Sequence, residues 1–213
     1  MALASGLFGN FQDGGKNVMN PLKSITGTLI SGLVLAAIIA LAATEIGMAD
    51  SGAVVILIHV AVGITWIGLL YYFNFVQVPA MGEAAADEGG PGGAGISKYV
   101  APRALLWFRW SALATWLSGA TYLLEKQEFM NAFTLDGTYG LTIGVGAWLG
   151  TIMLFNVWIL IWPNQKKILG IVEATAEQIG TAKTVALMAS RTNTALSIPM
   201  MMSMVGAHHG YFL

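Results

Sequence analysis

Five long apolar stretches constrain this chain more than any other feature of its sequence. They cover residues 25–43, 53–79, 104–124, 140–162 and 193–213. A helix that crosses a bilayer needs about 20 predominantly apolar residues, so each stretch has roughly the length of one span. Only 10% of the residues are charged, whereas soluble proteins average about 25%. We therefore expect an all-α protein, a polytopic transmembrane helical bundle that forms a single membrane domain over residues 1–213.

The first apolar stretch has a competing interpretation. Lys16 and Lys23 precede it, and Ala40, Leu41 and Ala42 lie near its end. This pattern is also typical of a cleaved signal peptide. We expect the helix to be retained as the first membrane span.

Two connecting segments complete the predicted architecture. Residues 83–95 are rich in glycine and predict a flexible link after the second span. Residues 168–191 are amphipathic and rich in helix formers, which predicts a cytoplasmic extension or an interfacial helix. We expect Ser190 or Thr192 to cap the last span and Pro199 to kink it.

The distribution of basic residues predicts the orientation of the bundle. Apart from Lys126, all Lys and Arg residues lie in or near three segments: the N-terminal flank, residues 80–103 and residues 163–192. Because Lys and Arg are enriched in cytoplasmic loops, we expect a cytoplasmic N-terminus and a periplasmic C-terminus in a bacterial inner membrane. The net charge of −1 and the lack of a basic tract argue against a nucleic-acid partner.

All three histidines of the chain lie in apolar segments: His59, His208 and His209. The second span runs inward, and His59 lies about 9 Å along it. The fifth span runs outward, and the other two histidines lie roughly 22–24 Å along it. In a hydrocarbon core of about 30 Å, all three reach one layer near the periplasmic face.

Two imidazoles on different helices are the arrangement that holds the iron of a b-type haem. Gly63 lies one turn from His59 and, with Gly206 and Ala207, would leave room for a flat macrocycle. We therefore predict a haem b site, with His59, Gly63, His208 and His209 as binding residues and the histidines as iron ligands. The alternative is that one histidine packs and the other two form a hydrated helix end. No cysteine is present, which excludes disulfides, Fe–S clusters and covalently attached c-type haem.

Two further sets of polar residues lie within the apolar stretches. Ser111, Thr115, Ser118, Gly119 and Tyr122 follow helical spacing and predict a face turned to the bundle interior, with close packing as its main role. A second set lies toward the cytoplasmic side and comprises Asn74, Gln77, Arg109 and Asn156. Its arginine either extends to lipid headgroups or joins a pocket for an anionic ligand or a haem propionate.

Four sequence blocks together resemble a known family. The blocks are HVAVGITWIG (59–68), WFRWSALATWLSG (107–119), NVWILIWPNQKK (156–167) and SRTNTALSIPM (190–200). They are similar to the membrane domain of the bacterial urate hydroxylase (PuuD) family, the urate oxidase N-terminal domain. The resemblance covers about residues 53–209.

This resemblance implies an inner-membrane protein whose full-length relatives hydroxylate urate and pass electrons to a fused cytochrome c. His59 matches the family's histidine on the second helix, and His208 or His209 matches the histidine after the SIPM helix. Arg109 occupies a position that is basic in the family. We expect a short form without the cytochrome c module, because no C-x-x-C-H sequence is present.

From these observations we predict a membrane redox protein that binds haem b and transfers electrons near the periplasmic face. Its expected partners are the lipid bilayer and a periplasmic cytochrome c or a larger membrane complex. The alternative is a non-catalytic accessory subunit of a respiratory or other membrane complex. Urate hydroxylation itself is a third possibility, and transport is disfavoured because no span carries paired charges at mid-membrane.

Overall fold

The computed structural model describes residues 20–43 and 51–210, and these ranges contain helices and turns but no strand. The all-α prediction is therefore confirmed. Lys16, the loop residues 44–50 and the last three residues of the predicted fifth span lie outside the described residues. The chain divides into two compact units, Met1–Met48 and Ala49–Leu213.

The first unit contains the short 3₁₀ helix η1 (Pro21–Lys23) and the helix α1 (Ile25–Ala43). Ser24 lies between them, and its hydroxyl oxygen accepts a hydrogen bond from the Gly27 N–H at 3.0 Å. This bond satisfies one of the free N–H groups in the first turn of α1. The bounds of α1 agree with the predicted stretch 25–43.

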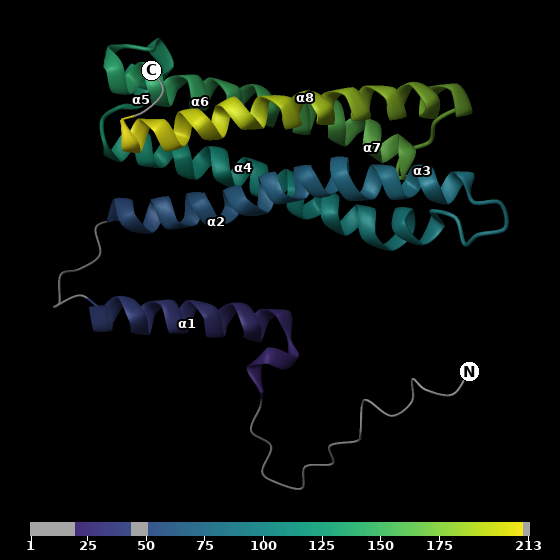
Figure 1. Ribbon diagram of the computed structural model, residues 1–213, viewed down its shortest axis with the longest axis horizontal. Helices are drawn as coiled ribbons and strands as arrows, with labels where there is room; N and C mark the ends of the chain where they lie inside the picture. The colour runs from purple at the N-terminus through teal and green to yellow at the C-terminus, as the bar shows by residue number, and fades with distance from the viewer. Residues whose placement is uncertain (1–19, 44–50, 211–213) are drawn as a thin grey trace, which may run out of the picture. The chain divides into compact units, whose positions relative to one another are not determined.

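The second unit is built from two antiparallel pairs of long helices (Figure 1): α2 packs on α4, and α6 packs on α8. Short helices and π-helical segments extend or connect them. The bounds are α2 Ser51–Tyr72, η2 Phe73–Gln77, α3 Val78–Ala86, η3 Ile96–Val100, α4 Ala101–Glu125, α5 Phe129–Thr134, α6 Gly137–Phe155, η4 Asn156–Ile161, α7 Trp162–Ile168 and α8 Ala176–His209.

Most of the segment 168–191 extends the last span and does not form an interfacial helix of its own. Residues 176–191 form the first half of α8 and continue directly into the last apolar stretch. The helix begins after Thr175, whose hydroxyl accepts from the Gln178 N–H at 3.2 Å while the Gln178 side chain accepts from the Thr175 N–H at 2.9 Å. This capping box fixes the start of α8, so Ser190 and Thr192 lie within the helix and cap nothing.

The glycine-rich link is shorter than predicted. The second span continues without a break from α2 through η2 and α3 to Ala86, so only residues 87–93 lie between helical segments. Pro79 lies near the start of α3, where its missing N–H is tolerated.

The two helix pairs meet in an apolar core at the middle of the unit. Its most deeply buried side chains include Trp66, Leu70, Phe108, Met153 and Val157. Two hydrogen bonds between α2–η2 and α8 lie in the same region. The Tyr71 hydroxyl lies 2.9 Å from the Ser197 hydroxyl, and the Asn74 Nδ2 donates to the Ser190 hydroxyl oxygen at 2.8 Å.

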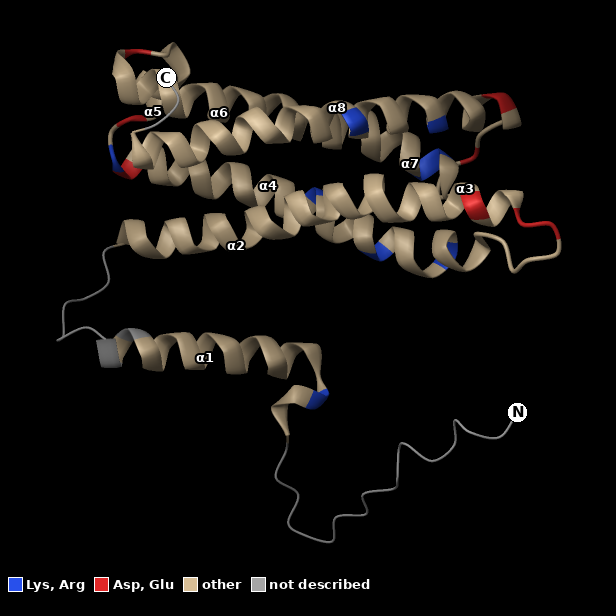
Figure 2. Cartoon of the chain, viewed as in Figure 1, with Lys and Arg blue, Asp and Glu red and all other residues tan. Residues whose placement is uncertain are grey.

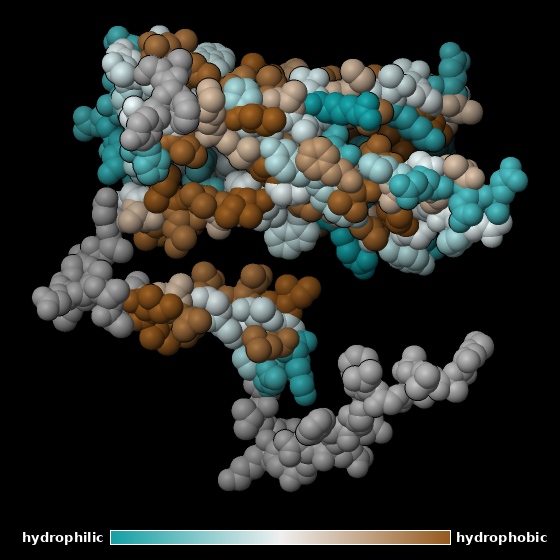
Figure 3. Space-filling model, in the orientation of Figure 1, coloured by the Kyte–Doolittle hydropathy of each residue, from teal (hydrophilic) through white to brown (hydrophobic). Residues whose placement is uncertain are grey.

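The charges of the second unit are unevenly distributed (Figure 2). Basic residues are common in the half that holds α3 and α7, whereas the half that holds α5 and the start of α2 carries few charges except at its end. Hydrophobic side chains lie at the surface along α2 (Figure 3). In the described part of the chain, two helices are long and apolar enough to cross a membrane, Ser51–Ala86 and Gly137–Ile168.

Candidate functional site

A cavity of about 350 Å³ opens between the two helix pairs at the end of the unit that holds α5. All three histidines line it, with His59 coming from α2 and His208 and His209 from the last turn of α8. The structure thus brings to one cavity three residues that the depth estimate predicts in one layer. Further lining residues come from α4 (Thr115, Trp116, Gly119, Ala120, Tyr122, Leu123), α5 (Phe133), α6 (Ile143, Gly146, Ala147, Gly150) and α8 (Met200, Met204, Val205).

His59 is held in one orientation by α4. Its Nδ1 lies 2.9 Å from the backbone carbonyl oxygen of Thr115 and 3.2 Å from the hydroxyl oxygen of Ser118. A carbonyl oxygen can only accept, so Nδ1 carries the proton and donates it. The neutral ring therefore keeps its lone pair on Nε2, the atom available to a metal.

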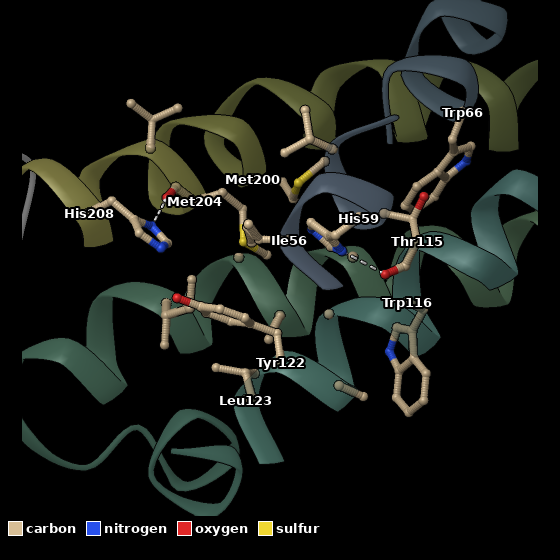
Figure 4. A pocket seen from close by; sticks show the side chains of 18 of the residues that line it. Ile56, His59, Trp66, Thr115, Trp116, Tyr122, Leu123, Met200, Met204 and His208 are labelled. Atoms are coloured by element: carbon tan, nitrogen blue, oxygen red, sulfur yellow. Dashed lines mark hydrogen bonds between the residues drawn. The ribbon is translucent and has the colours of Figure 1, made fainter. Parts of the chain in front are cut away.

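His208 repeats this arrangement within α8. Its Nδ1 donates to the backbone carbonyl oxygen of Met204 at 3.2 Å, which again leaves the lone pair on Nε2. Its ring centroid lies 6.3 Å from that of Tyr122 on α4. Figure 4 shows His59 and His208 on two sides of the same space, each with its hydrogen bond to a backbone carbonyl.

Small residues shape the wall next to His59. A Cβ atom added to Gly119 would lie 2.9 Å from His59 Cε1 and 3.2 Å from its Nδ1, so this glycine is what admits the imidazole beside α4. Gly150 also lines the cavity, and a Cβ atom there would meet nothing within 4 Å. Gly63, which we predict to line the site, lies instead toward Thr115, 3.7 Å from its Cγ2 atom, and does not line the cavity.

Two further side chains bear on what the cavity can hold. In the view of Figure 4, the Met204 side chain enters the space between the two imidazoles. A methionine is unbranched with three rotatable bonds, so it can make way for a ligand at small cost. Trp66 also lines the cavity with 2% of its surface exposed, and its indole N–H is buried without a hydrogen-bond partner.

The donor set favours a ligand that needs two nitrogens. Within residues 20–43 and 51–210, no three His, Cys, Asp or Glu side chains are grouped so that they could hold a bare metal ion. A haem iron already has four macrocycle nitrogens and needs only two axial ligands from the protein.

The polar set of Asn74, Gln77, Arg109 and Asn156 does not form one pocket. Asn74 donates to Ser190, and the Asn156 amide donates to the Asn193 side-chain oxygen at 2.8 Å. The Arg109 guanidinium lies 3.8 Å from the centre of the Trp162 ring, a cation–π contact. Gln77 lines a different cavity at the other end of the unit.

Sequence reasoning underestimates the contribution of α4. Its polar and small stripe does face the interior, because Ser111 and Thr115 are buried. Thr115, Gly119 and Tyr122 moreover line the histidine cavity, a role beyond the packing we predict for them. The signal in the sequence is the single glycine in that stripe, which marks the place where another group approaches the helix closely.

In a comparison with protein families, residues 126–213 match the family described as urate oxidase N-terminal. This match supports the resemblance of the sequence blocks to that family over this part of the chain. No curated protein and no solved structure matches the chain. The urate oxidase N-terminal match includes α5, α6, α7 and α8, and thus His208 and His209, whereas His59 precedes it.

Proposed function

We propose that this protein is an integral membrane redox protein that binds haem b between His59 and His208. One observation carries this proposal: both imidazoles line one cavity, and each donates its Nδ1 proton to a backbone carbonyl. The hydrogen bonds fix the ring orientation and raise the basicity of Nε2, as the partners of metal-bound histidines do. His208 is a better candidate than His209 because its ring is oriented by such a bond.

The walls of the cavity suit a porphyrin. Most lining side chains are apolar, and Gly119 and Gly150 leave space close to the helix backbones. Bound in this site, the haem would supply reversible one-electron chemistry, and the apolar shell and the two imidazoles would tune its potential.

A membrane location is supported by the surface of the second unit. Residues 51–82, 110–124, 137–165 and 192–207 contain no Asp, Glu, Lys or Arg, so all four long helices share an uncharged layer. Large apolar side chains such as Leu57, Ile64 and Ile198 are exposed. An aqueous protein rarely exposes so much apolar surface, whereas lipid would cover it. With α1 as a further apolar helix, we propose five membrane spans.

The charges support an orientation with the histidine cavity near the periplasmic face. The second unit has eight basic residues, and Lys126 lies at the end that holds α5. The other seven lie toward the end that holds α3 and α7, or where that end meets the uncharged layer: Lys98, Arg103, Arg109, Lys166, Lys167, Lys183 and Arg191. The excess of basic residues marks the cytoplasmic side. Glu125, Glu128 and Asp136 at the opposite end would attract a basic patch on a periplasmic cytochrome c.

A reduced-minus-oxidised absorption spectrum of the purified protein tests the redox proposal. We expect a Soret band that shifts on reduction with dithionite, and reoxidation of the reduced protein by added cytochrome c. A protein that binds no haem even after incubation with haemin would contradict the proposal. In that case, co-purification with a larger complex would support an accessory subunit.

Urate hydroxylation is a second candidate, favoured by the match of residues 126–213 to the urate oxidase N-terminal family. It predicts that urate reduces the haem of the purified protein, or an added cytochrome c through it. The haem proposal does not depend on this result, because dithionite reduction reads the cofactor without urate.

A further inference from the structure

A second cavity lies at the opposite end of the unit, and neither of the two roles above uses it. Its volume is about 390 Å³, within the range of small-molecule sites. It lies between α3 and the start of α4 on one side and α7 and the first half of α8 on the other. It shares no lining residue with the histidine cavity.

All three π-helical segments of the described residues contribute to the wall of this cavity. Gln77 belongs to η2, Ser97 to η3 and Ile161 to η4. A π-helical turn is rare and costs stability relative to an α-helix, so it occurs mostly where function retains it. Three such turns around one cavity point to a binding site.

The polar side chains of the cavity indicate the chemistry of its ligand. Lys183 brings a positive charge to the wall, and no Asp or Glu lines it. Gln165 adds a side-chain amide, whose N–H groups can donate to a negatively charged oxygen. The opposite wall is apolar and includes Leu105 and Phe108.

The cavity also lies where the charged and uncharged parts of the unit meet. On this side, the uncharged ranges of the long helices are bounded by basic residues: Arg109 on α4, Arg191 on α8 and Lys166 on α7. In a membrane, this level corresponds to the lipid headgroups, where an amphiphile would place its charged head.

From these features we propose that the second cavity binds a single-chain amphiphile with an oxyanion head. The head would pair with Lys183, and the hydrocarbon chain would lie against Leu105 and Phe108. A fatty acid carboxylate and a lysophospholipid phosphate share this chemistry. The proposal therefore specifies a negatively charged head group and one hydrocarbon chain.

A fluorescence titration tests this proposal with the full chain in nanodiscs of neutral phosphatidylcholine. The probe is a dansyl-labelled fatty acid, and the competitors are oleate, oleoyl lysophosphatidate and oleyl alcohol. We expect saturable binding that the two anions displace and the alcohol does not. Displacement by oleate alone would assign a carboxylate site, and displacement by lysophosphatidate alone a phosphate site.

Three variants assign the binding to this cavity. Lys183→Ala should weaken binding of the anion about tenfold, and Lys183→Arg should retain it. Gly82 lines the cavity, and a Cβ atom there would meet nothing within 4 Å, so Gly82→Leu should fill the space and abolish saturable binding. Gly180→Leu is the control, because Gly180 is equally open but lies outside the cavity.

Equal displacement by oleyl alcohol, or unchanged binding to both Lys183→Ala and Gly82→Leu, would overturn the proposal. Lys183 is exposed, so its substitution tests the site even if Gly82→Leu does not fold. The haem spectrum should be the same in all these variants, which separates failure of this site from failure of the histidine site.

Discussion

The Nδ1 atom of His59 lies 2.9 Å from the backbone carbonyl oxygen of Thr115, and this bond joins α2 to α4 at the histidine cavity. The acceptor is a backbone atom, so a substitution at residue 115 does not remove this hydrogen bond as long as α4 stays helical. The orientation of the imidazole therefore depends on how closely α4 approaches, and hence on the residue that faces the ring.

Gly119→Ala should disturb that orientation. The new Cβ atom would lie 2.9 Å from His59 Cε1, so the ring must move. Overpacking of this kind costs about 1–3 kcal/mol, so haem affinity should fall by about fivefold to a hundredfold. Haem titration of the apoprotein measures the change.

Gly63→Ala is the matched control for this prediction. Its Cβ atom would lie 3.7 Å from Thr115 Cγ2, an ordinary contact, and we expect haem affinity to change less than about threefold. If the two alanine variants lose affinity equally, the close contact at Gly119 has no special role.

Gly150→Leu should fill the histidine cavity. Gly150 lines it and faces open space, so the larger side chain can enter without displacing the backbone. We expect the variant to fold and to bind little or no haem. Gly68→Leu, at an exposed position of α2 outside the cavity, should bind haem normally. Full haem binding by Gly150→Leu would place the cofactor elsewhere.

Asn193→Ala should lower the stability of the bundle without touching the cavity. Asn193 is fully buried, accepts from the Asn156 amide at 2.8 Å and donates to the Met153 carbonyl oxygen at 2.9 Å. Its loss leaves buried polar groups unpaired, at a cost of about 1–3 kcal/mol each. Unfolding in denaturant measures the loss, with Thr184→Ala on the exposed face of α8 as the control. Equal stability of the two variants would show that the Asn156–Asn193 pair contributes little.

The position of the histidines could be predicted from the sequence, whereas their neighbours could not. Helical rise is fixed at 1.5 Å per residue, so counting along two spans places His59 and His208 at one depth. Which helix faces His59 depends on packing between helices. The sequence therefore points to Gly63, which lies on the same helix as His59. In the structure, the glycine that faces the imidazole ring is Gly119 on α4.

The start of α8 and the second cavity show two further limits of sequence reasoning. The change from an amphipathic to an apolar pattern near Arg191 resembles a boundary, but backbone hydrogen bonds continue through it and the helix begins at Ala176. The π-helical turns at η2, η3 and η4 each accommodate one extra residue in a turn, which hardly alters the hydrophobic pattern. The sequence therefore gives no indication of the cavity that they surround.

The most direct test of the haem proposal is the absorption spectrum of the haem-loaded protein in four forms: wild type, His59→Ala, His208→Ala and His209→Ala. We predict a low-spin, six-coordinate spectrum for wild type and for His209→Ala. His59→Ala and His208→Ala should each give a five-coordinate, high-spin spectrum or lose the haem. A low-spin spectrum that survives in either His59→Ala or His208→Ala would contradict the assignment of these two residues as the axial ligands.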